Sequence, residues 1–187
     1  MKKYKVKDKE ELKEIIKKAK VNADLNYLDV SNVTDMYGIF SNSKFNGNIS
    51  EWDVSKVKYM NAMFSNSKFN GDISNWNVSK VTEMGYVFRE SEFNGDISNW
   101  NVQKVIFMNT MFYKSKFNKD ISNWNTSNVT DISHMFQNLK VKMNPNNLKL
   151  FNENIKNKNF AEPQYKNKDI PNIVKKLDKL GNLSVFL

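Results

Sequence analysis

The residue types that most often carry out chemistry are scarce in this chain of 187 residues. It has no cysteine and one histidine, His134. The missing cysteines exclude disulfides, thiol nucleophiles, zinc–thiolate sites and iron–sulfur clusters. A single imidazole excludes any site that needs two, and His134 stands at a repeated position that elsewhere holds Ala62, Tyr86 and Thr110. We interpret it as a surface residue, and we expect a non-enzyme with no catalytic residue, no cofactor and no metal.

Acidic and hydroxyl side chains do recur, at one constant spacing along the chain. Asp72, Asp96 and Asp120 share one repeated position, which Asn48 occupies first. A ladder of carboxylates suits Ca²⁺, but capping of backbone amides within each turn is the interpretation we favour. Because no histidine base recurs beside the serines, we interpret them as turn hydroxyls and not as nucleophiles. The repeated serines are Ser43, Ser67, Ser91 and Ser115, and Ser50, Ser74, Ser98 and Ser122.

The same spacing governs most of the large apolar residues. The unit reads W-x-V-S-x-V-x-x-M-x-x-M-F-x-x-S-x-F-N-G-D-I-S-x, and units begin at 28, 52, 76, 100 and 124. A unit of this length is too short to bury a core of its own, so the units must stack on one another. Each repeated position then becomes a ladder of like side chains in the core. The most regular ladders are Trp52, Trp76, Trp100 and Trp124, and Phe45, Phe69, Phe93 and Phe117.

Each coil of this stack has three expected parts. V-x-x-M predicts a short parallel strand, and M-x-x-M-F has the spacing of one helical turn. F-N-G-D is turn chemistry, with Gly47, Gly71 and Gly95 where a positive φ is expected. The asparagine before each glycine is predicted to hydrogen-bond the loop backbone along the stack. These asparagines are Asn46, Asn70, Asn94 and, before Lys119, Asn118.

The units ISNWNVSKVTEM (73–84), FNGDISNWNV (93–102) and LDVSNVTDMYGIF (28–40) resemble the BspA-like leucine-rich-repeat family of bacterial surface proteins. The resemblance implies a right-handed, leucine-rich-repeat-like solenoid with a role in adhesion or protein binding. We therefore expect a repeat solenoid of about five 24-residue coils, with short parallel strands and short helical turns. The resemblance implies a cell-surface or secreted protein. The charged start contains no apolar stretch of a signal peptide's roughly 7–15 residues, so a cytoplasmic location also stays open.

Two flanks enclose the repeats and divide the chain into 1–27, 28–137 and 138–187. The first is an N-terminal cap with a helix at about 8–20, and the last is a basic appendage with a helix at about 171–180. The repeats hold ten Lys and Arg against eleven acids, a net charge of −1. The flanks carry +4 and +6, so the whole chain's +9 resides in them. No window reaches the roughly 20 apolar residues of a membrane span.

Positions that vary inside a fixed frame are the candidates for binding a partner. The Lys58 column runs Lys58, Thr82, Ile106, Thr130, and the Tyr59 column runs Tyr59, Glu83, Phe107, Asp131. Successive strand residues face opposite ways, so we expect one of the two columns to be exposed. Aromatic side chains on a surface favour binding. The alternative is that these positions vary because they lie on a surface that binds nothing and is under relaxed selection.

Three functions follow from these features. The favoured one is a non-enzymatic protein-interaction or adhesion module that displays variable side chains on a rigid scaffold. The second is a cytoplasmic inhibitor or immunity-type protein that binds another protein. The third is nucleic-acid binding through the basic flanks, which is disfavoured because arginine, the better phosphate ligand, occurs once against 28 lysines. The partner's identity and the oligomeric state stay open.

Overall fold

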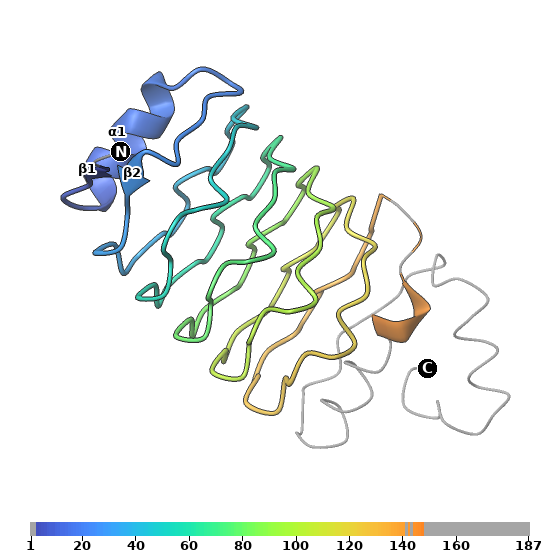
Figure 1. The fold of residues 1–187 in the computed structure, drawn as a ribbon. Helices are drawn as coiled ribbons and strands as arrows, with labels where there is room; N and C mark the ends of the chain where they lie inside the picture. The colour runs from blue at the N-terminus through green and yellow to red at the C-terminus, as the bar shows by residue number, and fades with distance from the viewer. Residues whose placement is uncertain (1–2, 141, 143, 148–187) are drawn as a thin grey trace, which may run out of the picture.

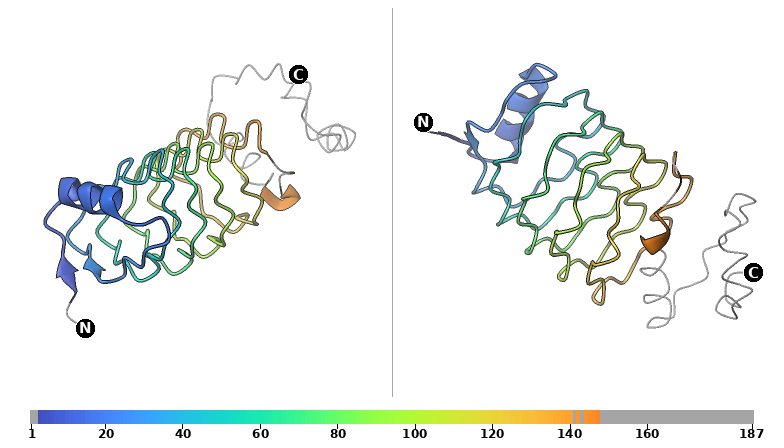
Figure 2. Two further views of the ribbon diagram at one scale, coloured as in Figure 1. Left: turned by 90° about the horizontal axis from the view of Figure 1, so that it is seen from above. Right: turned by 45° about the vertical axis from the view of Figure 1, so that its right-hand side comes forward.

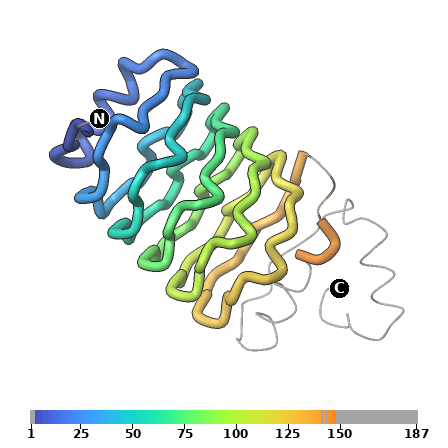
Figure 3. The backbone as a smooth tube through the Cα atoms, in the orientation of Figure 1, coloured from blue at the N-terminus to red at the C-terminus, as the bar shows by residue number. Residues whose placement is uncertain are grey.

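The computed structural model of the chain describes residues 3–140, 142 and 144–147. Its backbone winds through successive coils that lie side by side along one axis (Figures 1 and 3). The regular elements of these residues are β1 (Tyr4–Lys5), α1 (Lys9–Lys18), β2 (Leu28–Asp29) and the 3₁₀ turn η1 (Pro145–Asn147). β1 and β2 pair in parallel, with Tyr4 opposite Leu28. Between β2 and η1 the architecture is carried by contacts between coils.

Backbone hydrogen bonds join each coil to the next in a constant register of one repeat unit. Parallel β-bridges connect Asp35 to Tyr59, Tyr59 to Glu83, Glu83 to Phe107 and Phe107 to Asp131. Six backbone hydrogen bonds recur at each of these four junctions. At one junction the N–H groups of 60, 62, 64 and 66 donate to the carbonyls of 83, 85, 87 and 89, at 2.7–3.0 Å. The pairing is parallel, but its strands are shorter than the sequence predicts.

The expected helical turn in M-x-x-M-F is replaced by a chain of tight turns. Alternate N–H groups donate to the next coil, while those of Met63 and Ser65 close turns on the carbonyls of Met60 and Ala62. A helix would instead direct all its N–H groups along its own axis. The backbone alternates because Ala62 and Asn66 have φ of 54° and 51°, in the left-handed region. The same two positions are left-handed in the other coils: Gly38, Tyr86, Thr110 and His134, and Asn42, Glu90, Lys114 and Asn138.

The repeated glycines have a different role from the one predicted. Gly47, Gly71 and Gly95 do not have a positive φ. A Cβ atom at Gly71 would lie 2.9 Å from the ring of Phe69, and one at Gly95 would lie 2.8 Å from the ring of Phe93. Glycine is favoured there because the core phenylalanine two residues earlier passes close to the backbone, although Lys119 stands at the equivalent position after Phe117.

Three aromatic ladders fill the core. Phe64, Phe88 and Phe112 stack at centroid distances of 5.6 and 5.7 Å, with rings within 7° of parallel. The ladder of Phe45, Phe69, Phe93 and Phe117 keeps spacings of 6.3–6.5 Å. The four tryptophans are 3–4% exposed, and each indole Nε1–H donates to a carbonyl 27 residues earlier, at 2.9–3.2 Å. Both predicted ladders therefore lie inside the stack.

The N-terminal helix covers the first coil (Figure 2). Helix α1 lies within the predicted range of 8–20, and Asp8 caps it by accepting the N–H of Glu11 at 2.9 Å. The carboxylate of Glu11 in turn accepts the N–H of Lys7 at 2.6 Å, one residue before the cap, so it reaches back over the helix start much as the acid of a capping box does. Leu12 and Ile16 are buried against the stack. This arrangement covers the apolar layer that the first coil would otherwise expose.

At the other end, η1 closes the last described coil. The side chain of Asn147 is fully buried, donates Nδ2–H to the carbonyl of Lys119 and accepts the N–H of Ile121, both at 2.8 Å. Asn146 donates to the carboxylate of Asp120 at 2.5 Å. No pattern in the repeats indicates this amide clamp in advance. The predicted helix at about 171–180 lies outside the described residues.

Removal of one indole from the tryptophan ladder tests the stack. We expect Trp100→Ala to lower the free energy of unfolding by about 3–5 kcal/mol, because it opens a cavity and removes one of the two N–H donors of the Ile73 carbonyl. Trp100→Phe keeps most of the ring and should cost less. Urea denaturation followed by circular dichroism measures both, and a change near zero for Trp100→Ala would place the ladder in solvent.

Candidate functional site

The Tyr59 column forms a row along one side of the stack. Its members are joined through the β-bridges, and Asp35 extends the row by one coil. Tyr59 and Phe107 expose 43% and 40% of their surface, while Glu83 and Asp131 are half-buried. The structure therefore brings four residues from four coils into one row of alternating aromatic and acidic side chains.

The Lys58 column is exposed as well, contrary to the expectation that one of the two columns faces inward. Ile106 is 38% exposed, and Thr82 is half-buried. The N–H of Lys58 donates to the preceding coil, whereas that of Met60 donates to the following coil. In a regular strand, residues two apart direct these groups the same way. The backbone bends at this point, so the Lys58 and Tyr59 columns both face solvent.

Hydrogen bonds hold the acidic members of the row. The Oε2 atom of Glu83 accepts from Asn61 Nδ2 at 2.7 Å, and the Oδ1 atom of Asp131 accepts the N–H of Ser133 at 2.8 Å. Asp35 pairs with Lys9 of α1 at 2.8 Å. Burial raises the pKa of Asp35, but the hydrogen bond from Lys9 and others outweigh it, so the pKa is lowered overall. These contacts hold the three carboxylates in fixed positions on the surface.

Two further exposed aromatics near this row were not singled out from the sequence. Tyr37 is 53% exposed, and Lys9 Nζ lies 5.1 Å from its ring centroid. Tyr86 is 42% exposed at one of the left-handed positions. Tyr86 shares its repeated position with His134, and the sequence-based interpretation of that position concerns His134 alone. A search of every varying position for aromatic residues would have found Tyr86.

The polar ladders of the turns are structural, as predicted. Each Asn side chain accepts the N–H of the asparagine in the next coil, at 2.7–3.0 Å, from Asn46 to Asn118. The aspartate position accepts the N–H two residues later, at 2.9 Å in Asp72, Asp96 and Asp120. The hydroxyls of Ser43, Ser67, Ser91 and Ser115 accept the N–H two residues later in the same way.

The comparisons with known proteins give one finding. The model of a repeat-type family, described as Mycoplasma protein of unknown function, DUF285, matches residues 10–114 and 67–173. The chain belongs to the DUF285 family. No curated protein and no solved structure matches it. Two overlapping matches of one model along one chain agree with a sequence that repeats throughout.

In the described part of this DUF285 chain, no three His, Cys, Asp or Glu side chains gather to hold a metal ion. His134 is exposed on a left-handed turn. No helix among the same residues has the length and apolarity to cross a membrane.

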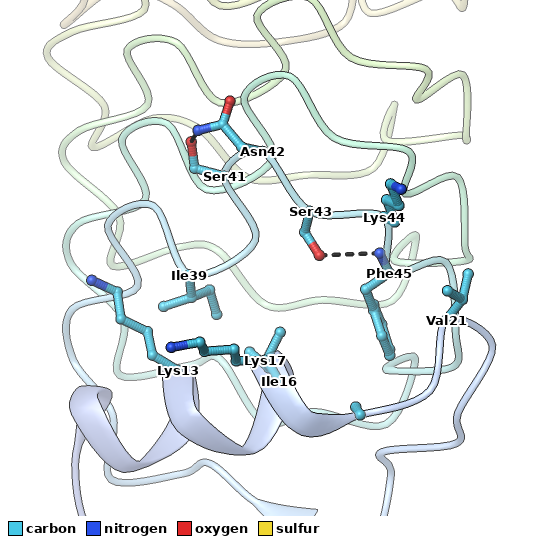
Figure 4. A pocket seen from close by; sticks show the side chains of 11 residues that line it. Lys13, Ile16, Lys17, Val21, Ile39, Ser41, Asn42, Ser43, Lys44 and Phe45 are labelled. Carbon is cyan, nitrogen blue, oxygen red and sulfur yellow. Dashed lines mark hydrogen bonds between the residues drawn. The ribbon is translucent and has the colours of Figure 1, made fainter.

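A hollow of about 330 Å³ lies between α1 and the first coil (Figure 4). Its inner wall includes the apolar side chains of Ile16, Ile39 and Phe45, and Lys13 and Lys17 extend along it from the helix. The hydroxyl oxygen of Ser43 accepts the N–H of Phe45 at 3.0 Å. We interpret the hollow as the seam where the cap meets the stack, because the hydroxyls of Ser41 and Ser43 in its wall accept hydrogen bonds from nearby residues of the same coil.

The turn carboxylates of this DUF285 chain predict a loss of stability in acid. Hydrogen bonds from the backbone N–H and then the hydroxyl of Ser74 and Ser98 hold the pKa of Asp72 and Asp96 below the usual range. Their contribution is present above the ordinary pKa of about 3.9 and is lost as the pH falls through the lowered values. Asp72→Asn with Asp96→Asn keeps the acceptor oxygen, as Asn48 does naturally.

We therefore expect the double variant to fold, and its free energy of unfolding to fall less steeply than the wild type's below about pH 4. Urea denaturation at a series of pH values measures both slopes. Identical slopes would show that these carboxylates do not favour their ionised form in the fold.

Proposed function

We propose that this chain is a non-enzymatic protein-interaction or adhesion module, built as a leucine-rich-repeat-like solenoid of the BspA-like kind. The Tyr59 column, with Ile106 and Tyr86 beside it, is the binding surface. The observation that carries the proposal is the pair of exposed rings of Tyr59 and Phe107 in one row, two coils apart. Large apolar side chains in a fixed row on a surface are typical of sites that bind another protein.

The contrast between fixed and varying positions supports this proposal. The tryptophan and phenylalanine ladders are buried and each keeps one residue type through four coils, so they account for the fold. By contrast, the Lys58 column holds lysine, threonine or isoleucine, and the Tyr59 column holds tyrosine, glutamate, phenylalanine or aspartate, on the same backbone. A rigid frame of this kind lets surface residues change without loss of fold, and it binds a partner with little ordering cost.

The charge distribution favours the Tyr59 column, and not the basic flanks, as the binding site. The repeats have a net charge of −1, so binding at their exposed rings does not depend on a strong overall charge. Binding through apolar contacts should largely survive high salt, whereas binding through clustered lysines falls steeply as salt rises. The BspA-like resemblance of the units at 73–84 and 93–102 points to the same role.

The test is a double variant, Tyr59→Ala with Phe107→Ala. We expect it to weaken partner binding by at least about 30-fold, because the loss of even one aromatic hot spot costs about 2 kcal/mol or more. The partner is first captured on the immobilised chain at high salt, and affinities are then measured by biolayer interferometry. Both side chains are about two-fifths exposed or more, so the fold should be retained.

The matched control is Tyr27→Ala, which removes an aromatic side chain that is 51% exposed and lies outside the Tyr59 column. It should bind the partner as the wild type does. Full affinity in the Tyr59 and Phe107 double variant would show that this face is not the binding surface.

A further inference from the structure

Glu83 occupies a distinctive position in the Tyr59 column. β-Bridges place it directly between Tyr59 on the preceding coil and Phe107 on the following coil. Paired strands lie about 4.8 Å apart, so a group bound to the Glu83 carboxylate can lie within about 6 Å of both rings. No ion pair joins Glu83 to any residue that the structure describes. A carboxylate between two exposed rings is therefore left with its charge unbalanced.

A second observation lies beside the same carboxylate. Asn61 donates its Nδ2–H to Glu83 Oε2 at 2.7 Å, but its Oδ1 atom is buried and has no donor. Of the buried side-chain polar atoms among the described residues, it alone lacks a partner. An unpaired buried acceptor is destabilising and rare in folded proteins, so its persistence here needs an explanation. The surroundings of Asn61 and Glu83 therefore offer more hydrogen-bond acceptors than donors.

The side chain of Asn109 lies close to the backbone of the next coil at this point. Gly85 is in register with Asn61 and has no side chain, and a Cβ atom there would lie 2.8 Å from Asn109 Oδ1. Acceptor oxygens of Asn61, Glu83 and Asn109 therefore come from three successive coils, beside the row that presents Tyr59 and Phe107. The chemistry that complements such a place is a cation with several donors and a flat face.

We propose that Glu83, between Tyr59 and Phe107, is the site that receives an arginine side chain of the protein partner. The guanidinium group is planar, has five N–H donors and stacks on aromatic rings, so it fits acceptors and rings together. It pairs with the carboxylate of Glu83 and lies against one or both rings. The lysine ammonium has three donors and no flat face, which makes it the poorer fit. The proposal deepens the proposed function and rests on it.

The experiment titrates the full chain with N-acetyl-arginine amide and follows the backbone amide signals by NMR. N-acetyl-citrulline amide is the neutral control of the same shape, and N-acetyl-lysine amide tests the guanidinium preference. We expect saturable shifts at Tyr59, Glu83 and Phe107 with the arginine compound, and shifts at least tenfold smaller with the other two. Added salt should weaken the response, because the contact includes a charge pair near the surface.

Two variants assign the site. Glu83→Gln keeps the shape of the side chain and should reduce arginine binding at least tenfold. Glu51→Gln alters an exposed acid outside the Tyr59 column and should leave arginine binding unchanged. Unchanged binding in Glu83→Gln, equal shifts with citrulline or lysine, or no shift with arginine would each overturn the proposal.

The outcomes also separate this proposal from the proposed function. If arginine does not bind at Glu83 but Tyr59→Ala with Phe107→Ala abolishes partner binding, the face binds through apolar contacts alone. The interaction module then stands and the arginine site falls. If arginine binds at Glu83 and the double variant keeps full partner affinity, the arginine site stands and the proposed binding surface falls.

Discussion

The structure depends on one constraint, which is that each coil must pair with its neighbours in a register of one repeat unit. Six backbone hydrogen bonds at each junction set this register, and every side-chain ladder follows from it. Phe88 stacks on Phe64 and Phe112 because the backbone places them opposite one another. The ladders in turn exclude water from the backbone bonds. Each coil is thus stable only as part of the stack.

The period alone was enough to predict which residues share a ladder, which are buried and how the polar turns are capped. The asparagine ladder from Asn46 to Asn118 could be predicted because a repeated turn places like side chains one coil apart. The left-handed turns could not, because Ala62, Tyr86 and Thr110 carry no preference for positive φ, although the glycine and asparagines at equivalent positions in other coils do. The prediction of a positive φ at Gly71 was wrong for a related reason. Glycine serves both for unusual φ and for close approach, and only the position of the Phe69 ring decides between them.

The candidate site was predictable in its residues but not in its geometry. Variation inside a fixed frame identified the Lys58 and Tyr59 columns, whereas a simple alternating strand would have buried one of them. The backbone bends between Lys58 and Met60 and exposes both. The unpaired oxygen of Asn61 arises from a side-chain contact with Glu83, 22 residues away, which no local pattern indicates. The same frame that makes the fold insensitive to these positions makes them available for binding.

Native-state hydrogen exchange tests the register of the stack most directly. The amides of Met84, Tyr86 and Phe88 donate to carbonyls of the following coil at 2.9–3.0 Å. Tyr86 is the sharpest case, because its side chain is 42% exposed while its N–H lies within the junction. We predict strong protection of this amide, comparable to that of Met84 and Phe88. Exchange of the Tyr86 amide at the rate of an unfolded chain, in a protein otherwise folded, would contradict the register.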